Sequence, residues 1–137
     1  MTAKEFLTQA FRISDRIASF KRQLETIEGG MRSPNYKSVG GHGGEIVSDT
    51  ERRGLKAIKL ERQLKDEIEH LEAVELAVYN AINALVDINE QLVLRYRYVE
   101  LGADGKQLSW DVIAYKLRYS RAQTIRLHGK ALEHLIF

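Results

Sequence analysis

The stretch that decides the fold is SWDVIAYKLRYSRAQTIRLHGKALEHLIF, residues 109–137. It opens on Ser109, a residue type preferred at helix N-caps, and continues with an amphipathic helical pattern. A second candidate N-cap, Ser120, follows after Arg118-Tyr119, which leaves no room for a flexible loop. Two helices joined so tightly must cross steeply, and Ala114 supplies the small side chain needed where their backbones come closest. The stretch therefore predicts a helix-turn-helix.

The second helix of this pair is expected to have a buried side and an outward side. The residues expected to face inward, centred on the first, are Ile125, Gly129, Leu132 and Ile136. A rotation of about 100° per residue then turns Gln123 and Arg126 outward in the first two turns. Gln suits adenine and Arg suits guanine in the major groove of double-stranded DNA, so these two are the predicted base contacts. The cations expected to contact phosphate oxygens are Arg118, Arg121 and Lys130.

Further helices are predicted upstream, and no segment alternates with period two, so the expected fold class is all-α. Thr2 and Glu5 form a capping-box pattern that predicts one helix over residues 3–28, ended by Gly29-Gly30. Residues 29–47 are rich in glycine and are expected to form a flexible linker.

Two more helix starts follow this linker. Ser48 with Glu51 is a second capping box, which predicts a long helix to Leu85. Asp87 then caps a shorter helix to about Leu101, before turn-forming residues 102–105.

The long helix has more apolar surface than it can cover alone. The first helix can fold back along it, and because that helix is shorter, part of the stripe is expected to meet another subunit in a coiled coil. The predicted oligomerisation residues are Leu60, Leu64, Ile68, Leu71 and Val78. The alternative is a hairpin packed only within the chain. We accordingly predict a helical oligomerisation region over residues 1–86 and a DNA-binding domain over residues 87–137.

Composition limits the possible functions. The net charge is only +2, but residues 95–137 carry eight Lys and Arg against four Asp and Glu, which suits an acidic partner such as DNA. Cysteine is absent, and the histidines have no metal-ligand spacing; His128 is expected to pack at the core edge. We expect no cofactor, no metal, no enzymatic chemistry and no membrane span. No export signal is visible, so the cytoplasm is the expected location.

A resemblance sharpens this expectation. The residues that carry it are Ser109-Trp110-Asp111, Ile113-Ala114, Leu117, Tyr119-Ser120, Leu127-His128, Ala131-Leu132 and Leu135. They resemble region 4 of bacterial sigma factors, and still more the RinA/ArpU-type regulators of phages and prophages. Leu94-Arg95-Tyr96, Ser33-Pro34-Asn35 and the glycines from Gly40 to Gly44 are also similar to that family. The resemblance implies a transcriptional regulator that activates late genes in the cytoplasm of a bacterial host, with Gln123 and Arg126 as base contacts.

Two alternatives remain open at the level of sequence. A small terminase subunit would also bind DNA, although such subunits usually place the helix-turn-helix before the oligomerising helices. A helical interaction protein would instead contact host RNA polymerase or another regulator. One departure from the sigma-type pattern is Arg118, which stands where glycine is usual in the turn.

Overall fold

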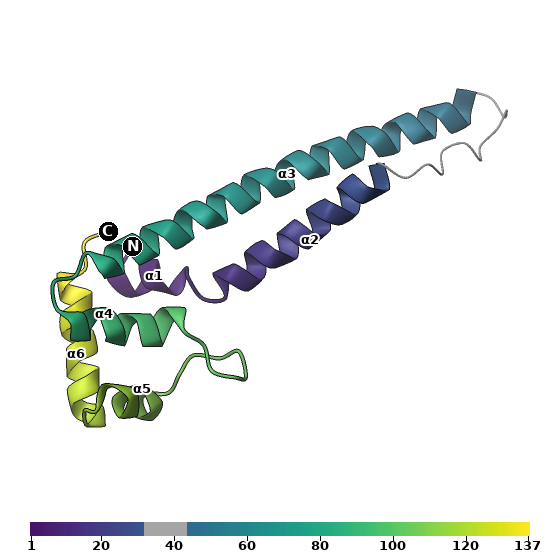
Figure 1. The fold of residues 1–137 in the computed structure, drawn as a ribbon. Helices are drawn as coiled ribbons and strands as arrows, with labels where there is room; N and C mark the ends of the chain where they lie inside the picture. The colour runs from purple at the N-terminus through teal and green to yellow at the C-terminus, as the bar shows by residue number, and fades with distance from the viewer. Residues whose placement is uncertain (32–43) are drawn as a thin grey trace. The chain divides into compact units, whose positions relative to one another are not determined.

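The computed structural model describes residues 1–31 and 44–137 (Figure 1). Its elements are α1 (Ala3–Thr8), α2 (Ile13–Met31), α3 (Gly44–Asn83), α4 (Ile88–Leu94), the π-helical turn η2 (Arg95–Val99), α5 (Trp110–Leu117) and α6 (Arg121–His134). The described residues contain no strand beyond an isolated antiparallel bridge between Leu101 and Gln107. The all-α prediction is therefore confirmed. The predicted linker is wrong at both ends, because residues 29–31 belong to α2 and α3 begins at Gly44, before the predicted start at Ser48. Residues 32–43 lie outside the described part.

The helix predicted over residues 3–28 is wrong as a single element. The capping box of Thr2 and Glu5 opens α1 as expected, but α1 ends at Thr8 and α2 begins only at Ile13. Between them Arg12 takes a left-handed backbone conformation, with φ of 51°. The apolar spacing continues across the break, and residues 9–12 contain neither glycine nor proline, so the pattern gives no sign of it.

The chain divides into two compact units, and they do not follow the predicted boundary at residue 86. One unit comprises residues 14–71, and the other comprises residues 1–13 together with residues 72–137. The N-terminal helix α1 and the end of α3 therefore belong to the same unit as α4, α5 and α6.

In the unit of residues 14–71, α2 and α3 lie side by side and run in opposite directions (Figure 1). The ammonium group of Lys65 on α3 lies 3.9 Å from the carboxylate of Glu28 on α2 and 2.8 Å from that of Glu61. The hydrogen bond to Glu61 raises the pKa of Lys65. Leu64, Ile68 and Leu71 are buried within this single chain.

Most of the predicted oligomerisation residues are buried within the chain itself. Leu64, Ile68 and Leu71 are already covered in one chain, and Val78 lies in the core of the other unit. Only Leu60 of the predicted set is exposed. This differs from the expectation of a free stripe: the chain itself covers four of the five positions, and Leu60, which has the same helical spacing, remains 46% exposed.

The unit of residues 1–13 and 72–137 has one apolar core. Its fully buried side chains come from five helices and include Leu7, Ile82, Leu94, Ile113 and Ala131. Chain ends distant in sequence meet here, since the rings of Phe6 and Phe137 stack with centroids 5.0 Å apart. The core therefore holds α1 against the C-terminal end of the chain.

The turn between α5 and α6 keeps the left-handed residue expected of such turns, although that residue is arginine. Arg118 has φ of 61° and ψ of 38°. Its N–H donates to the carbonyl of Tyr115, and the N–H of Tyr119 donates to that of Ala114. These are the two hydrogen bonds of a Schellman motif, which ends a helix by satisfying its last carbonyls. The departure from glycine therefore costs backbone strain of about 1 kcal/mol without changing the turn.

We therefore expect Arg118→Gly to stabilise the protein by about 0.5–1 kcal/mol, because glycine adopts the left-handed conformation without strain. Urea unfolding followed by circular dichroism measures this change. Lys116→Gly is the matched control: it lies inside α5 and should lose about 1 kcal/mol. Equal losses in both variants would contradict the assignment of strain to Arg118.

Candidate nucleic-acid interface

Helix α6 begins directly after the turn because Ser120 caps it. The hydroxyl of Ser120 accepts a hydrogen bond from the N–H of Gln123 at 3.1 Å, and the amide oxygen of Gln123 accepts one from the N–H of Ser120 at 3.0 Å. This is a capping box that satisfies two backbone donors. Its carboxamide partner, Gln123, is one of the two predicted base contacts.

The inward face of α6 is not the predicted one. Thr124 and Ala131 are both 0% exposed, and Leu135 is buried, whereas Ile125 is 43% exposed. Gly129 and Ile136 are also exposed, and Leu132 is half-buried. The expectation that Ile125 is the centre of the buried face is therefore wrong by one residue, or about 100° of rotation. Small side chains at 124 and 131 let α6 pack closely against α4 and α5.

Thr124 can occupy the buried face because its hydroxyl is satisfied locally. It donates to the carbonyl oxygen of Ser120 at 2.9 Å. A buried hydroxyl without such a partner would cost free energy, and this one has its partner inside the helix.

The outward face of α6 still presents both predicted base contacts to solvent. Gln123 and Arg126 are exposed, and so is Lys130. Ala122 and Gly129 share this face with Arg126, and a Cβ built on Gly129 would meet no atom within 4 Å. Ala122 and Gly129 therefore leave open space on one side of Arg126, whereas Gln123 and Lys130 flank it on the other side.

The predicted phosphate-contacting cations are also exposed. Arg121 lies 3.9 Å from the carboxylate of Asp111, and both side chains are largely in solvent. An exposed pair at that distance contributes little to stability, so Arg121 can exchange Asp111 for another anion at low cost. Arg118 stands at the turn, and Lys130 lies further along α6.

Polar contacts that the sequence pattern did not suggest fix α6 to α4 and to the turn. The carboxylate of Glu90, itself buried, lies 2.8 Å from Nδ1 of His134. At the other end the amide of Asn89 donates to the hydroxyl of Tyr119 at 2.8 Å. Both of these partners come from α4, so α4 contributes to the position of α6 and of the turn.

His128 packs at the core edge, as the sequence suggests, inside an aromatic cluster. Its Nε2 lies 2.8 Å from the hydroxyl oxygen of Tyr98, and its ring meets that of Trp110 edge to face at 4.8 Å. The guanidinium of Arg97 covers the Trp110 ring at 4.4 Å and donates to the carbonyl of Leu108. Burial, followed by the charges of Arg97 and Lys4, lowers the pKa of His128 to about 4.

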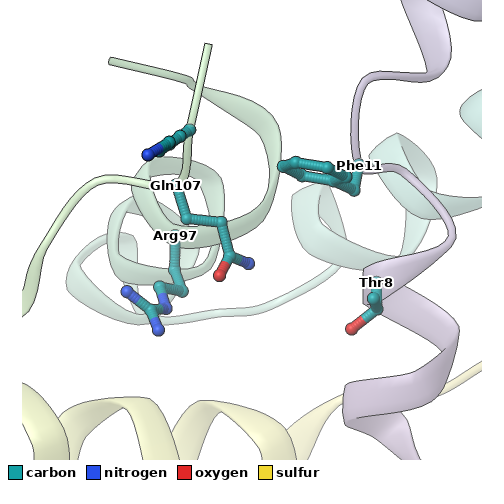
Figure 2. A pocket seen from close by; sticks show the side chains of 5 residues that line it. Thr8, Phe11, Arg97 and Gln107 are labelled. Atoms are coloured by element: carbon teal, nitrogen blue, oxygen red, sulfur yellow. The ribbon is translucent and has the colours of Figure 1, made fainter. Parts of the chain in front are cut away.

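A separate pocket of about 440 Å³ lies in the same unit (Figure 2). Its lining residues are Thr8, Phe11, Arg97, Lys106 and Gln107. None of them belongs to α6, so the pocket is distinct from the exposed face described above. Arg97 is already engaged with Trp110 and Leu108, which reduces what it can offer a ligand.

Among the described residues, no three His, Cys, Asp or Glu side chains are grouped so that they could hold a metal ion. In that same part of the chain no helix combines the length and the apolar character needed to cross a membrane. Comparisons with protein-family models, with curated proteins and with solved structures give no significant match. The resemblance to RinA/ArpU-type regulators therefore stays a prediction from the residues quoted above.

The buried histidine predicts a pH dependence of stability. The pKa of His128 is about 4 in the folded protein against 6.5 in the unfolded chain, so its contribution is complete above about pH 6.5 and is lost as the pH falls towards 4. We expect His128→Gln to reduce the drop in the free energy of unfolding between about pH 7 and pH 5, measured by urea titration.

The control for this prediction is His70→Gln, because His70 is an exposed residue of α3. It should retain the pH dependence of the wild type. If His128→Gln also keeps the wild-type pH dependence, His128 is not the source of the loss of stability at low pH.

Proposed function

We propose that α5, the turn and α6 form a helix-turn-helix that binds double-stranded DNA, with α6 in the major groove. The observation that carries this proposal is the exposed face of α6, where Arg126 stands between Ala122 and Gly129 with no element of the same unit covering it. An exposed, cationic helix face beside a tight turn suits insertion into a groove. The net positive charge of residues 95–137 supports the same partner.

Arg126 is the principal base contact in this proposal. Its guanidinium can donate two parallel hydrogen bonds to O6 and N7 of guanine. Gln123 lies one turn nearer the start of α6, but its amide oxygen already accepts the capping hydrogen bond from Ser120. A bidentate contact to adenine needs the same oxygen, so Gln123 competes with its own cap and contributes less discrimination.

The backbone contacts come from Arg118, Arg121 and Lys130. Arg121 is the first residue of α6, where free N–H groups and the positive end of the helix dipole also attract a phosphate. These contacts position α6 without selecting a sequence. Following the resemblance, we propose that the protein is a transcriptional regulator of phage or prophage genes.

Selection from random duplexes, followed by binding titrations, tests the proposal. We expect Arg126→Ala to lose about 1–3 kcal/mol on the selected site and to relax one position of the consensus. Lys130→Ala should weaken selected and random duplexes alike and lower the slope of log affinity against log salt by about one. Equal losses on both duplexes for Arg126→Ala would remove the base contact from the proposal.

A second candidate is a protein contact, for instance with RNA polymerase. The observation in its favour is the outer side of α5, where Val112 and Tyr115, at i and i+3, are both exposed. The salt series separates the two, because DNA binding weakens steeply as counterions are released. If the wild type binds duplexes without that steep slope, the protein contact becomes the better proposal.

We also propose that the protein self-associates, through the part of α3 that its own chain leaves exposed. Leu55 is 67% exposed and Ile58 is 46% exposed, and their spacing of three residues places them on one side of α3. Leu60 is exposed nearby. A dimer with two copies of α6 would bind two half-sites related by the symmetry of the protein.

We expect the wild type to be a dimer or larger at high micromolar concentration, and Leu55→Lys with Ile58→Lys to shift it to monomer. Sedimentation equilibrium measures both. Lys56→Gln is the control on the same helix and should leave the mass unchanged. A monomeric wild type would refute self-association without touching the DNA proposal.

A further inference from the structure

The exposed face of α6 carries an apolar side chain that the contacts described so far do not use. Ile125 is 43% exposed, in the second turn of the helix and next to Arg126. Ala122, three residues before it, and Gly129, four residues after it, present only a methyl group and a hydrogen atom on one side of Ile125, while the side chains of residues 121 and 128 on its other side are larger. The side chain of Ile125 is therefore accessible from the side that it shares with Ala122 and Gly129.

This position decides what the side chain can contact in the proposed complex. Arg126 is one residue away, about 100° around the helix, and α6 packs on the opposite side through Thr124, Ala131 and Leu135. When Arg126 faces a base edge, Ile125 faces the floor or wall of the same groove. The major groove offers one exposed apolar group, the C5-methyl of thymine.

We propose that Ile125 is a specificity residue that packs against the C5-methyl group of a thymine, next to the guanine contacted by Arg126. The inference rests on the proposed function and deepens it, since it states the chemistry of the preferred duplex. Apolar contact with this methyl group discriminates thymine from cytosine, because cytosine has hydrogen at C5. The polar pattern of α6 alone would give no such preference.

Removal of single methyl groups from the DNA tests the contact directly. Each thymine of the selected duplex is replaced in turn by uracil, which differs only by the C5-methyl, and the dissociation constant is measured. We expect one position at which the wild type loses about fourfold, the effect of leaving one methyl group exposed. Ile125→Ala should lose a similar factor on the thymine duplex and bind thymine and uracil duplexes equally.

The matched control is Ile136→Ala, since Ile136 is also an exposed isoleucine but lies beyond the end of α6. It should keep the wild-type ratio between thymine and uracil duplexes. Circular dichroism of Ile125→Ala should match the wild type, because Ile125 lies outside the apolar core of its unit.

Failure of this inference differs from failure of the proposed function. A wild type that binds a selected site but responds to no uracil replacement, or a consensus without thymine, overturns the role of Ile125 and leaves DNA binding intact. If Ile125→Ala still binds the thymine duplex more tightly than the uracil duplex, the role of Ile125 is likewise overturned and DNA binding is left intact. A wild type that selects no duplex overturns the proposed function and this inference with it.

Discussion

The rotation of α6 about its own axis is the constraint on which the candidate interface depends. Thr124 and Ala131 are completely buried, and their small side chains let α6 approach α4 and α5 closely. A larger residue at either position would force the helix away from its neighbours. Because the side of α6 that carries Thr124 and Ala131 is buried, Arg126 and Ile125 lie on its exposed side.

The turn before α6 contributes a second constraint. The left-handed Arg118 closes α5, and Ser120 opens α6 immediately afterwards, so the first turn of α6 is ordered from its first residue. The carbonyl oxygen of Ser120 also accepts a hydrogen bond from the hydroxyl of Thr124. This hydrogen bond makes the buried threonine compatible with an apolar core. Capping and rotation are thus coupled through one residue.

The unit that carries α6 is larger than the C-terminal stretch itself. Phe6 stacks on Phe137, Leu7 is buried in the shared core, and the end of α3 completes it. The aromatic cluster of Tyr98, His128 and Trp110 connects η2, α6 and α5. The position of α6 is therefore set by residues from both ends of the chain, and changes near residue 7 are expected to reach it.

The sequence alone predicted the all-α class, the tight turn, and the helix starts at Thr2, Asp87, Ser109 and Ser120. These features could be predicted because capping and turn formation depend on neighbouring residues in the chain.

The inward face of α6 depended on the tertiary structure. Two sets of positions on α6 have helical spacing: residues 125, 129, 132 and 136, and residues 124, 128, 131 and 135. The first set is more hydrophobic and is the one that the sequence favours. The second set is the one that is buried, because its small side chains allow close packing. The pairing of Glu90 with His134 likewise depended on the tertiary structure, since it joins residues far apart in the chain.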